Sequence, residues 1–157
     1  MATLADRHYE AADGAAALIT AAWAPAEPDG VTRDEVAEET YATMEGRQVF
    51  VFLTEAGAAE VERLNRGEVV NGFKISVRCY EKYTDPGRPT AAWMDERRTW
   101  LDTIYTALDK STEGQRMLTT LWTQTLEITD VTDAEAVAEL NLFVASIEVE
   151  FREVASG

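Results

Sequence analysis

The sequence predicts an α+β fold: a mixed, largely antiparallel sheet of about four to five strands with two main helices packed on one face. Two long segments repeat apolar residues every three or four positions, as the buried stripe of a helix does. Several other segments alternate apolar and polar residues, as half-buried strands do. The 157 residues, 46% of them hydrophobic, suffice for one core, so we expect a single domain over residues 1–157.

The first elements differ in clarity. Leu4 to Trp23 has the apolar spacing of a helix, and Pro25 ends it. Val31 to Met44 mixes helix-forming and strand-forming composition, and we favour a strand near Glu38 to Met44. Val49 to Leu53 is apolar on both sides, which predicts a strand that is buried on both faces and central in its sheet.

The middle of the chain combines a predicted helix, a strand and a second helix. Ala56 to Leu64 has a helix-like composition. Phe73 to Tyr83 alternates as a half-buried strand, which Asp85-Pro86-Gly87 ends. Thr90 is the expected N-cap of the clearest helix, with Arg98 and Asp102 spaced as an exposed ion pair. The apolar stripe of that helix consists of Trp93, Trp100, Leu101, Ile104 and Leu108.

The last third predicts two strands. Trp122, Leu126 and Ile128 alternate with polar residues and are expected on one face of a strand. Asp130 to Ala138 is a polar connection with room for one helical turn, and Asn141 to Val154 alternates as a long strand.

The charge and the single cysteine exclude several classes of protein. Fourteen basic and 29 acidic residues give a net charge of −15, which disfavours nucleic-acid binding as the main activity. Residues 1–46 carry −8 and residues 117–157 carry −7, so the two ends form one negative surface if they meet in space. Cys79 is the only cysteine, which excludes an internal disulfide, and its strand position predicts a small buried hydrophobe.

The chain carries no pattern for membrane insertion or secretion. No stretch approaches the roughly 18 consecutive apolar residues of a membrane span. Met1 to Glu10 lacks a basic region followed by an apolar block. We therefore expect a soluble protein without a secretory signal.

No catalytic set is recognisable in the sequence. His8 is the only histidine and lies in the first turns of a helix, away from the strand-end loops where catalytic bases gather. Asp95 and Glu96 diverge by about 100° around their helix and are expected on its solvated face. Nucleotide-binding glycine motifs are also absent from the sequence. We expect neither an enzyme nor a bound cofactor.

A metal site is not expected either. One histidine and one cysteine cannot supply the three or four ligands of a zinc site. Asp130 to Glu135 resembles the spacing of a calcium loop but lacks the glycine and the distal glutamate of that loop. A turn capped by Thr132 or Asp133 is the favoured interpretation.

Several short motifs follow one another in a consistent order. They are Glu45-Gly46-Arg47-Gln48-Val49-Phe50-Val51-Phe52, then Asn65-Arg66-Gly67-Glu68 before a strand ending Tyr80-Glu81-Lys82-Tyr83, then Trp93-Met94-Asp95-Glu96-Arg97, and Leu140 to Arg152 with Phe143, Ser146 and Glu150. In this order they resemble the tail-terminator family of long-tailed (siphovirus-type) bacteriophages over roughly residues 40–154.

The resemblance implies a mixed sheet flanked by helices that assembles as a homohexameric ring on the last ring of tail-tube protein. Such a ring ends tube polymerisation and offers a surface to the head-tail connector or stopper protein. It would lie at the tail-neck junction of the virion, and in the host cytoplasm during assembly. DNA would pass through its lumen without specific binding, because an acidic lining repels phosphates.

Subunit or partner contacts are expected in two charged loops, with Arg66 and Glu68 before the middle strand and Asp85 and Arg88 after it. Ordinary solvated loop charges are an equally good interpretation of these four residues. Two other functions stay open: another neck component, such as a head-completion or stopper protein, and an acidic nucleic-acid mimic that inhibits a host protein. The balanced charge of residues 47–116 argues against the mimic.

Overall fold

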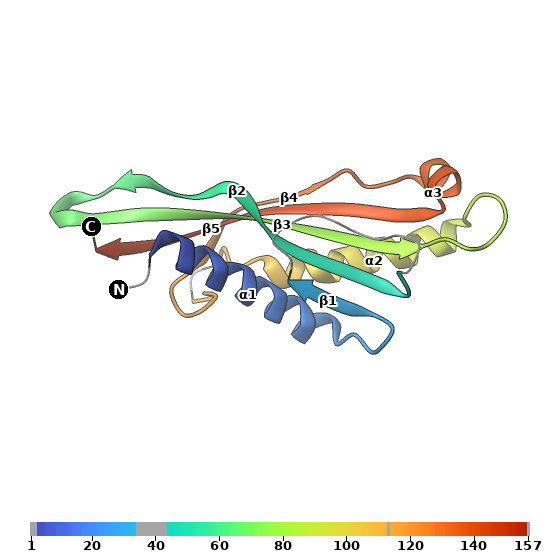
Figure 1. Cartoon of the computed structure of the whole chain (residues 1–157), viewed down its shortest axis with the longest axis horizontal. Coiled ribbons are helices and arrows are strands. Elements are labelled where there is room, and N and C mark those ends of the chain that lie inside the picture. The colour runs from blue at the N-terminus through green and yellow to red at the C-terminus, as the bar shows by residue number, and fades with distance from the viewer. Residues whose placement is uncertain (1–2, 34–43, 113, 157) are drawn as a thin grey trace.

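The computed structural model describes residues 3–33, 44–112 and 114–156, and it has the predicted α+β architecture (Figure 1). Within these residues, five strands form one sheet in the order β1-β2-β3-β5-β4. β1 pairs with β2 in parallel, and the other neighbouring pairs are antiparallel. The elements in chain order are α1 (Leu4–Trp23), β1 (Gly30–Arg33), β2 (Arg47–Arg63), the 3-10 turn η2 (Asn65–Gly67), β3 (Glu68–Lys82), α2 (Ala91–Leu108), β4 (Trp122–Thr129), α3 (Ala134–Leu140) and β5 (Leu142–Ser156).

The first helix begins and ends where the sequence predicts. The Thr3 hydroxyl accepts a hydrogen bond from the Asp6 N–H at 3.1 Å, and the Asp6 carboxylate accepts one from the Thr3 N–H at 3.1 Å. This reciprocal capping box satisfies two backbone donors at the start of α1. The chain leaves the helix at Ala24, whose φ of 50° is left-handed, immediately before Pro25.

The second helix confirms Thr90 as its N-cap, because the hydroxyl of Thr90 accepts a hydrogen bond from the Trp93 N–H at 3.1 Å. The expected ion pair of Arg98 with Asp102 is wrong, and Arg98 pairs instead with Asp95 at 3.1 Å. Helical side chains lean toward the N-terminus of their helix, which favours the partner one turn earlier. The predicted apolar stripe lies against the sheet, with Ile104 and Leu108 fully buried.

The two longest alternating strands are confirmed. On β3, Phe73, Ile75, Val77 and Cys79 are fully buried on the face that carries the helices. β3 and β5 pair over fifteen consecutive residues, from Glu68 with Ser156 to Lys82 with Leu142. The matching side chains of β5 are Phe143, Ala145, Ile147, Val149 and Phe151. Each large apolar side chain buried in this way contributes about 1.5–3 kcal/mol.

The helix expected at Ala56 to Leu64 is wrong, because β2 continues to Arg63. Ala59 pairs with Gly72 and Glu60 with Asn71, so this stretch forms the outer strand of a hairpin with β3. Helix propensity differs between ordinary residues by less than about 1 kcal/mol, and pairing with a neighbouring strand overrides it.

The expectation of a central, doubly buried strand at Val49 to Leu53 is also corrected. β2 is second in the sheet, and β3 is central. Val49 and Val51 are fully buried, whereas Phe50 and Phe52 on the other face are half-buried. The strand expected near Glu38 to Met44 lies outside the described residues, except for Met44, which is not in a strand.

One strand carries a register shift that the alternation hides. β4 has an irregularity between Thr123 and Thr125, so Trp122 pairs with Arg152 and Thr123 with Phe151. Thr123 therefore lies on the helix side and is buried, and Trp122 points to the opposite face from Leu126. The prediction of one shared face for Trp122 and Leu126 is wrong, because a bulge adds one residue and reverses the alternation.

The polar connection before β5 contains the helix α3. The carboxylate of Asp133 accepts a hydrogen bond from the Ala136 N–H at 2.8 Å, which makes Asp133 the N-cap. Val137 is fully buried in the main core and fixes this helix to the body. Asp130 to Glu135 is therefore a capped turn.

The two faces of the sheet have different surroundings. α1 and α2 cover one face, here called the helix face, and the opposite face, here called the open face, carries Phe52, Ser76, Arg78, Glu127, Glu148 and Glu150. Figure 1 shows the two chain ends at the β2-β3 hairpin end of the molecule and α3 at the other end. The acidic residues around α3 are thus remote from the start of α1.

Candidate functional site

The structure places the four predicted contact residues in two loops at opposite ends of β3. Arg66 lies in η2, and Glu68 is the exposed first residue of β3. Asp85 and Arg88 lie in the exposed loop after β3, where Arg88 contacts Glu135 at 3.4 Å. The fifteen residues of β3, at about 3.3 Å each, separate the loops by roughly 45–50 Å. The two loops cannot meet within one subunit.

A different feature stands out on the outer edge of β2. β1 pairs with β2 only from Gly30 with Gln48 to Arg33 with Val51. Among the described residues, no strand pairs with this edge from Phe52 to Arg63. An unpaired strand edge presents a row of backbone donors and acceptors that another strand can satisfy.

A bulge shapes this free edge. The pairing of β2 with β3 shifts between Leu53 and Ala58, and Ala56 has a φ of 53°. A Cβ at Gly57 would lie 2.7 Å from the Thr54 carbonyl oxygen and 3.0 Å from that of Lys74, so only glycine fits there. Close backbone approach of this kind is typical of bulges, which bend a strand and re-aim its side chains.

His8 binds a β3 carbonyl at the point where the ladder of hydrogen bonds between β2 and β3 is interrupted. Its Nε2 lies 2.7 Å from the carbonyl oxygen of Lys74. A carbonyl can only accept a hydrogen bond, so Nε2 carries the proton and donates. The histidine is 6% exposed and lies on α1, which ties this helix to the bulge.

A charged contact fixes the same part of α1 to the end of β5. The guanidinium of Arg7 donates from Nε to one carboxylate oxygen of Glu153 at 2.8 Å and from a terminal nitrogen to the other at 2.5 Å. This contact, helped by the Thr120 hydroxyl at 2.9 Å, holds the pKa of Glu153 below its usual range. The first turns of α1, including His8, are therefore held in place from two sides.

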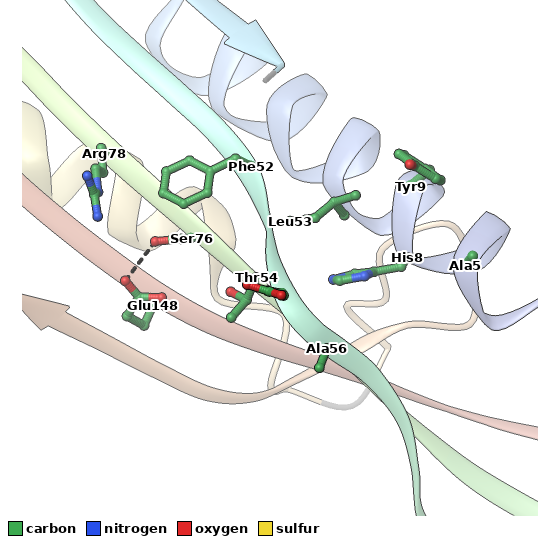
Figure 2. A pocket seen from close by; sticks show the side chains of 11 residues that line it. Ala5, His8, Tyr9, Phe52, Leu53, Thr54, Ala56, Ser76, Arg78 and Glu148 are labelled. Atoms are coloured by element: carbon green, nitrogen blue, oxygen red, sulfur yellow. Dashed lines mark hydrogen bonds between the residues drawn. The ribbon is translucent and has the colours of Figure 1, made fainter. Parts of the chain in front are cut away.

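A groove of about 730 Å³ surrounds the free edge of β2 at the bulge. Figure 2 shows Ala5, His8 and Tyr9 of α1 on one side of β2, and Ser76, Arg78 and Glu148 of the open face on the other side. Leu53 and Thr54 lie between them, on the strand itself. The groove therefore meets two aromatic or imidazole rings and an alanine of α1 on one side, and charged and polar groups of the open face on the other.

The polar half of the groove contains ready hydrogen-bonding groups. The Ser76 hydroxyl donates to Glu148 at 2.7 Å, and the guanidinium of Arg78 lies 5.2 Å from the ring centre of Phe52. The Thr54 hydroxyl is buried and has no hydrogen-bond partner among the residues that the structure describes. Burial of a hydroxyl without a hydrogen-bond partner lowers stability by about 1–3 kcal/mol, so a polar group that hydrogen-bonds to Thr54 would recover part of this free energy.

The opposite edge of the sheet, on β4, is also unpaired by any strand in the described part of the chain. Ile128 projects from β4 on the helix face and is 39% exposed. Glu127 projects on the open face directly opposite Glu148. Like charges directly opposite each other destabilise a strand pair, and Lys74 of β3 lines the same groove on the open face as these two carboxylates.

Both free edges lie at the same level of the sheet. One row across the open face runs from Phe52 through Ser76 and Glu148 to Glu127. Phe52 is the first residue of β2 beyond its pairing with β1, and Glu127 lies on the outer edge of β4; no strand of the described residues pairs with either edge there. A groove of about 220 Å³ crosses the open face between Thr54 and Glu127.

The sequence pattern placed Ile128 on a strand, but it gave no indication that Thr54, Glu127 or Ile128 takes part in a contact. The one available signal is Gly57, since an isolated glycine in a strand pattern indicates a bulge. Cys79 is fully buried as predicted, and burial raises the pKa of its thiol. Asp95 is exposed on α2 and pairs with Arg98, as a solvated helix face does.

Two searches cover the residues that the structure describes. No group of three or more histidine, cysteine, aspartate and glutamate side chains is placed to hold a metal ion there. Within the same residues, no helix is long and apolar enough to cross a membrane. Comparison of the sequence with protein-family models and with curated proteins finds no match.

Proposed function

We propose that this protein forms a closed ring of identical subunits that caps the tail tube of a long-tailed bacteriophage and joins it to the head connector. The observation that carries the ring is a pair of level sheet edges, on β2 beyond Val51 and on β4, that no strand of the described residues pairs with. The tail setting rests on the sequence resemblance to tail terminators.

Strand direction favours this assembly. Successive strands β2, β3, β5 and β4 are antiparallel, so β2 and β4 run in opposite directions. Rotation about an axis roughly parallel to the strands preserves these directions from one copy to the next. The β4 edge of one copy then meets the β2 edge of its neighbour as an antiparallel pair.

A repeated contact between two different edges closes into a ring when the rotation closes. The closed ring leaves no long strand edge exposed, which removes the hazard of uncontrolled pairing. Closure also suits a terminator, because a finished ring offers no lateral site for a further subunit. The net charge of −15 per chain repels phosphates, so DNA in the lumen of the ring would be bound only weakly.

The test measures mass and shape together. Light scattering over a wide concentration range, with negative-stain imaging of the same fractions, is run on the protein alone and with tail-tube protein of the source phage. We expect six-fold rings of six times 17.4 kDa, free or at tube ends, and tubes that stop growing once capped. A monomer that neither binds tube ends nor stops their growth would overturn the proposal.

A further inference from the structure

A short helix stands between β4 and β5, where a simple turn would suffice. Antiparallel neighbours need only about two to five connecting residues. Thr132 still pairs with β5, because its N–H donates to the Val144 carbonyl at 3.0 Å and its hydroxyl accepts from the Val144 N–H at 3.0 Å. Residues 133–141 then form α3 with its two caps before β5 begins. The helix therefore adds a surface that the sheet does not require.

This surface is held in place at both ends of the helix. The Asp133 carboxylate caps the first turn, and the Asn141 carbonyl accepts a hydrogen bond from the N–H of Tyr83, at the end of β3, at 3.0 Å. Val137 is buried in the core, whereas most other side chains of α3 are in contact with solvent. A surface that is already ordered loses little conformational freedom when a partner binds to it.

α3 carries the most exposed large apolar side chain of the described residues. Leu140, the last residue of the helix, is 60% exposed, and Val131, just before the N-cap, is 42% exposed. Leu140 follows Val137 by about one turn, so it continues the buried side of the helix beyond the edge of the core. A partner that covers Leu140 removes this apolar surface from water, which favours binding.

The charges of α3 oppose its own stability. Glu135 and Glu139 are exposed and lie four residues apart on one side of the helix, where like charges repel. Glu139 also lies at the negative end of the helix dipole, in a last turn without a basic residue. Arg88 contacts Glu135 at 3.4 Å, but the two side chains are 66% and 67% exposed, so this ion pair is weak. Basic side chains of a partner would relieve the repulsion.

The charge around Leu140 selects the kind of partner. Asp130 and Asp133 are exposed beside the helix, and Asp85 is exposed in the loop that contacts it through Arg88. A second copy of the chain would bring a further net charge of −15, and nucleic acid would bring phosphates, so both are repelled. The complementary surface is a protein with an apolar recess bordered by lysine or arginine side chains.

The place of α3 in the proposed ring suits the head connector. With the strands roughly parallel to the ring axis, α3 and the β2-β3 hairpin lie on opposite faces of the ring (Figure 1). All subunits of a ring have the same orientation, so their α3 helices form one acidic circle. Opposite charges on two surfaces speed their encounter. Large particles diffuse slowly, so this gain matters most in the joining of a tail to a head.

We propose that α3 is the surface through which the ring binds the head connector, with Leu140 in an apolar recess of the connector and Glu135 and Glu139 beside its basic side chains. This inference rests on the proposed function. It adds which face of the ring meets the connector, and it leaves the hairpin end for the tail tube.

Two substitutions on α3 test the contact by surface plasmon resonance, with the purified connector protein of the source phage immobilised and rings or capped tubes in solution. Glu139→Lys should lower the association rate about tenfold at low salt and weaken its salt dependence, because it removes steering charge. Leu140→Ser should raise the dissociation rate about tenfold, because apolar contact holds the formed complex together. The matched controls, Glu62→Lys and Leu118→Ser, make the same changes at exposed positions remote from α3 and should bind as the wild type does.

Thermal unfolding without the connector distinguishes a binding role from a structural one. Glu139→Lys replaces the repulsion from Glu135 by attraction and places a cation at the C-terminal end of the helix. It should therefore raise Tm while it slows binding. A residue with a merely structural role would change stability and binding in the same direction. Circular dichroism checks that each variant is folded, and Glu139→Lys alone decides the test should Leu140→Ser unfold.

The outcomes separate the two proposals. If the wild type forms no rings and caps no tubes, the proposed function fails and the inference fails with it. If the wild type caps tubes but does not bind the connector, or if the α3 variants bind the connector as the two controls do, the inference is wrong and the capping ring stands. Variants of α3 that lose tube capping and keep connector binding would show that α3 faces the tube, which also refutes the inference.

Discussion

Glu81 is expected to be the most sensitive charged residue of the fold, and its replacement by alanine tests the account of the interior. Its carboxylate accepts from Nε of Arg47 at 2.6 Å and from Nε of Arg97 at 2.8 Å, joining β2, β3 and α2. The side chains of Glu81 and Arg97 are only 12% and 10% exposed. Glu81→Ala therefore leaves a largely buried guanidinium without its main counter-ion.

The expected loss of stability in Glu81→Ala depends on the contacts that Arg47 and Arg97 keep. Breaking a buried ion pair by removing one partner costs about 3–5 kcal/mol. Arg47 keeps Glu96 at 2.9 Å, and Arg97 keeps Glu96 at 3.3 Å and the Trp93 carbonyl at 3.2 Å. These remaining contacts place the expected loss near the lower limit, at about 3 kcal/mol. For a chain of this size such a loss lowers Tm by roughly 6–12 °C.

The assay is urea unfolding followed by tryptophan fluorescence, at one fixed protein concentration so that assembly does not alter the comparison. Asp95→Ala is the matched control, because it removes an ion pair with Arg98 whose side chains are 71% and 57% exposed. That loss should stay below about 1 kcal/mol. The reasoning is refuted if Glu81→Ala lowers the free energy of unfolding no more than Asp95→Ala does. It is also refuted if the loss caused by Glu81→Ala is unchanged in the Arg97→Met variant, in which the ion pair between Glu81 and Arg97 no longer exists.

Three further predictions concern single positions. The ion pair with Arg7 lowers the pKa of Glu153 in the folded protein, so its stabilisation is fully present above the ordinary carboxyl pKa of 4.5 and is lost as the pH falls through the lowered value. The difference in free energy of unfolding between the wild type and Glu153→Gln should therefore narrow below about pH 4.5. A difference that widens there contradicts the ion pair. Gly57→Ala forces a Cβ to within 2.7 and 3.0 Å of two backbone oxygens, so it should lower the free energy of unfolding by about 1–3 kcal/mol, as measured in urea. Gly30→Ala is the control, because the atom nearest to its Cβ would lie at 3.4 Å; it should change the free energy of unfolding by no more than about 0.5 kcal/mol. Cys79 should react with a thiol reagent only at the rate of unfolding, and rapid labelling of the native protein would disprove its burial.

Periodicity was informative where one face of an element packs on the core. The helix at Leu4 to Trp23 and the strand containing Phe73 could be predicted because their buried residues recur at the spacing of the element. The stretch from Ala56 to Leu64 could not, because both faces of β2 are exposed near the hairpin end and its alanines favour a helix. Its strand conformation comes from pairing with β3, which local composition does not encode.

The candidate contact at the sheet edges was even harder to predict from the sequence than the strand at Ala56 to Leu64. A free sheet edge is a property of strand order, which depends on where β1 ends relative to β2. The faces of Ala58 and Trp122 depend on bulges, each of which reverses an alternation that is otherwise regular. The charged loops at Arg66 and Asp85 were conspicuous in the sequence, yet the length of β3 holds them apart.

The uninterrupted pairing of β3 with β5 has a mechanical consequence. Antiparallel hydrogen bonds lie perpendicular to the strands, so a pull along the strands loads all fifteen paired positions in shear at once. A pull across them opens the ladder one bond at a time and meets far less resistance. The ladder between β2 and β3 is interrupted twice, so it shares such a load less evenly than the ladder between β3 and β5. The molecule is therefore stiffest along the strands of β3 and β5, a direction that would run roughly along the axis of the proposed ring.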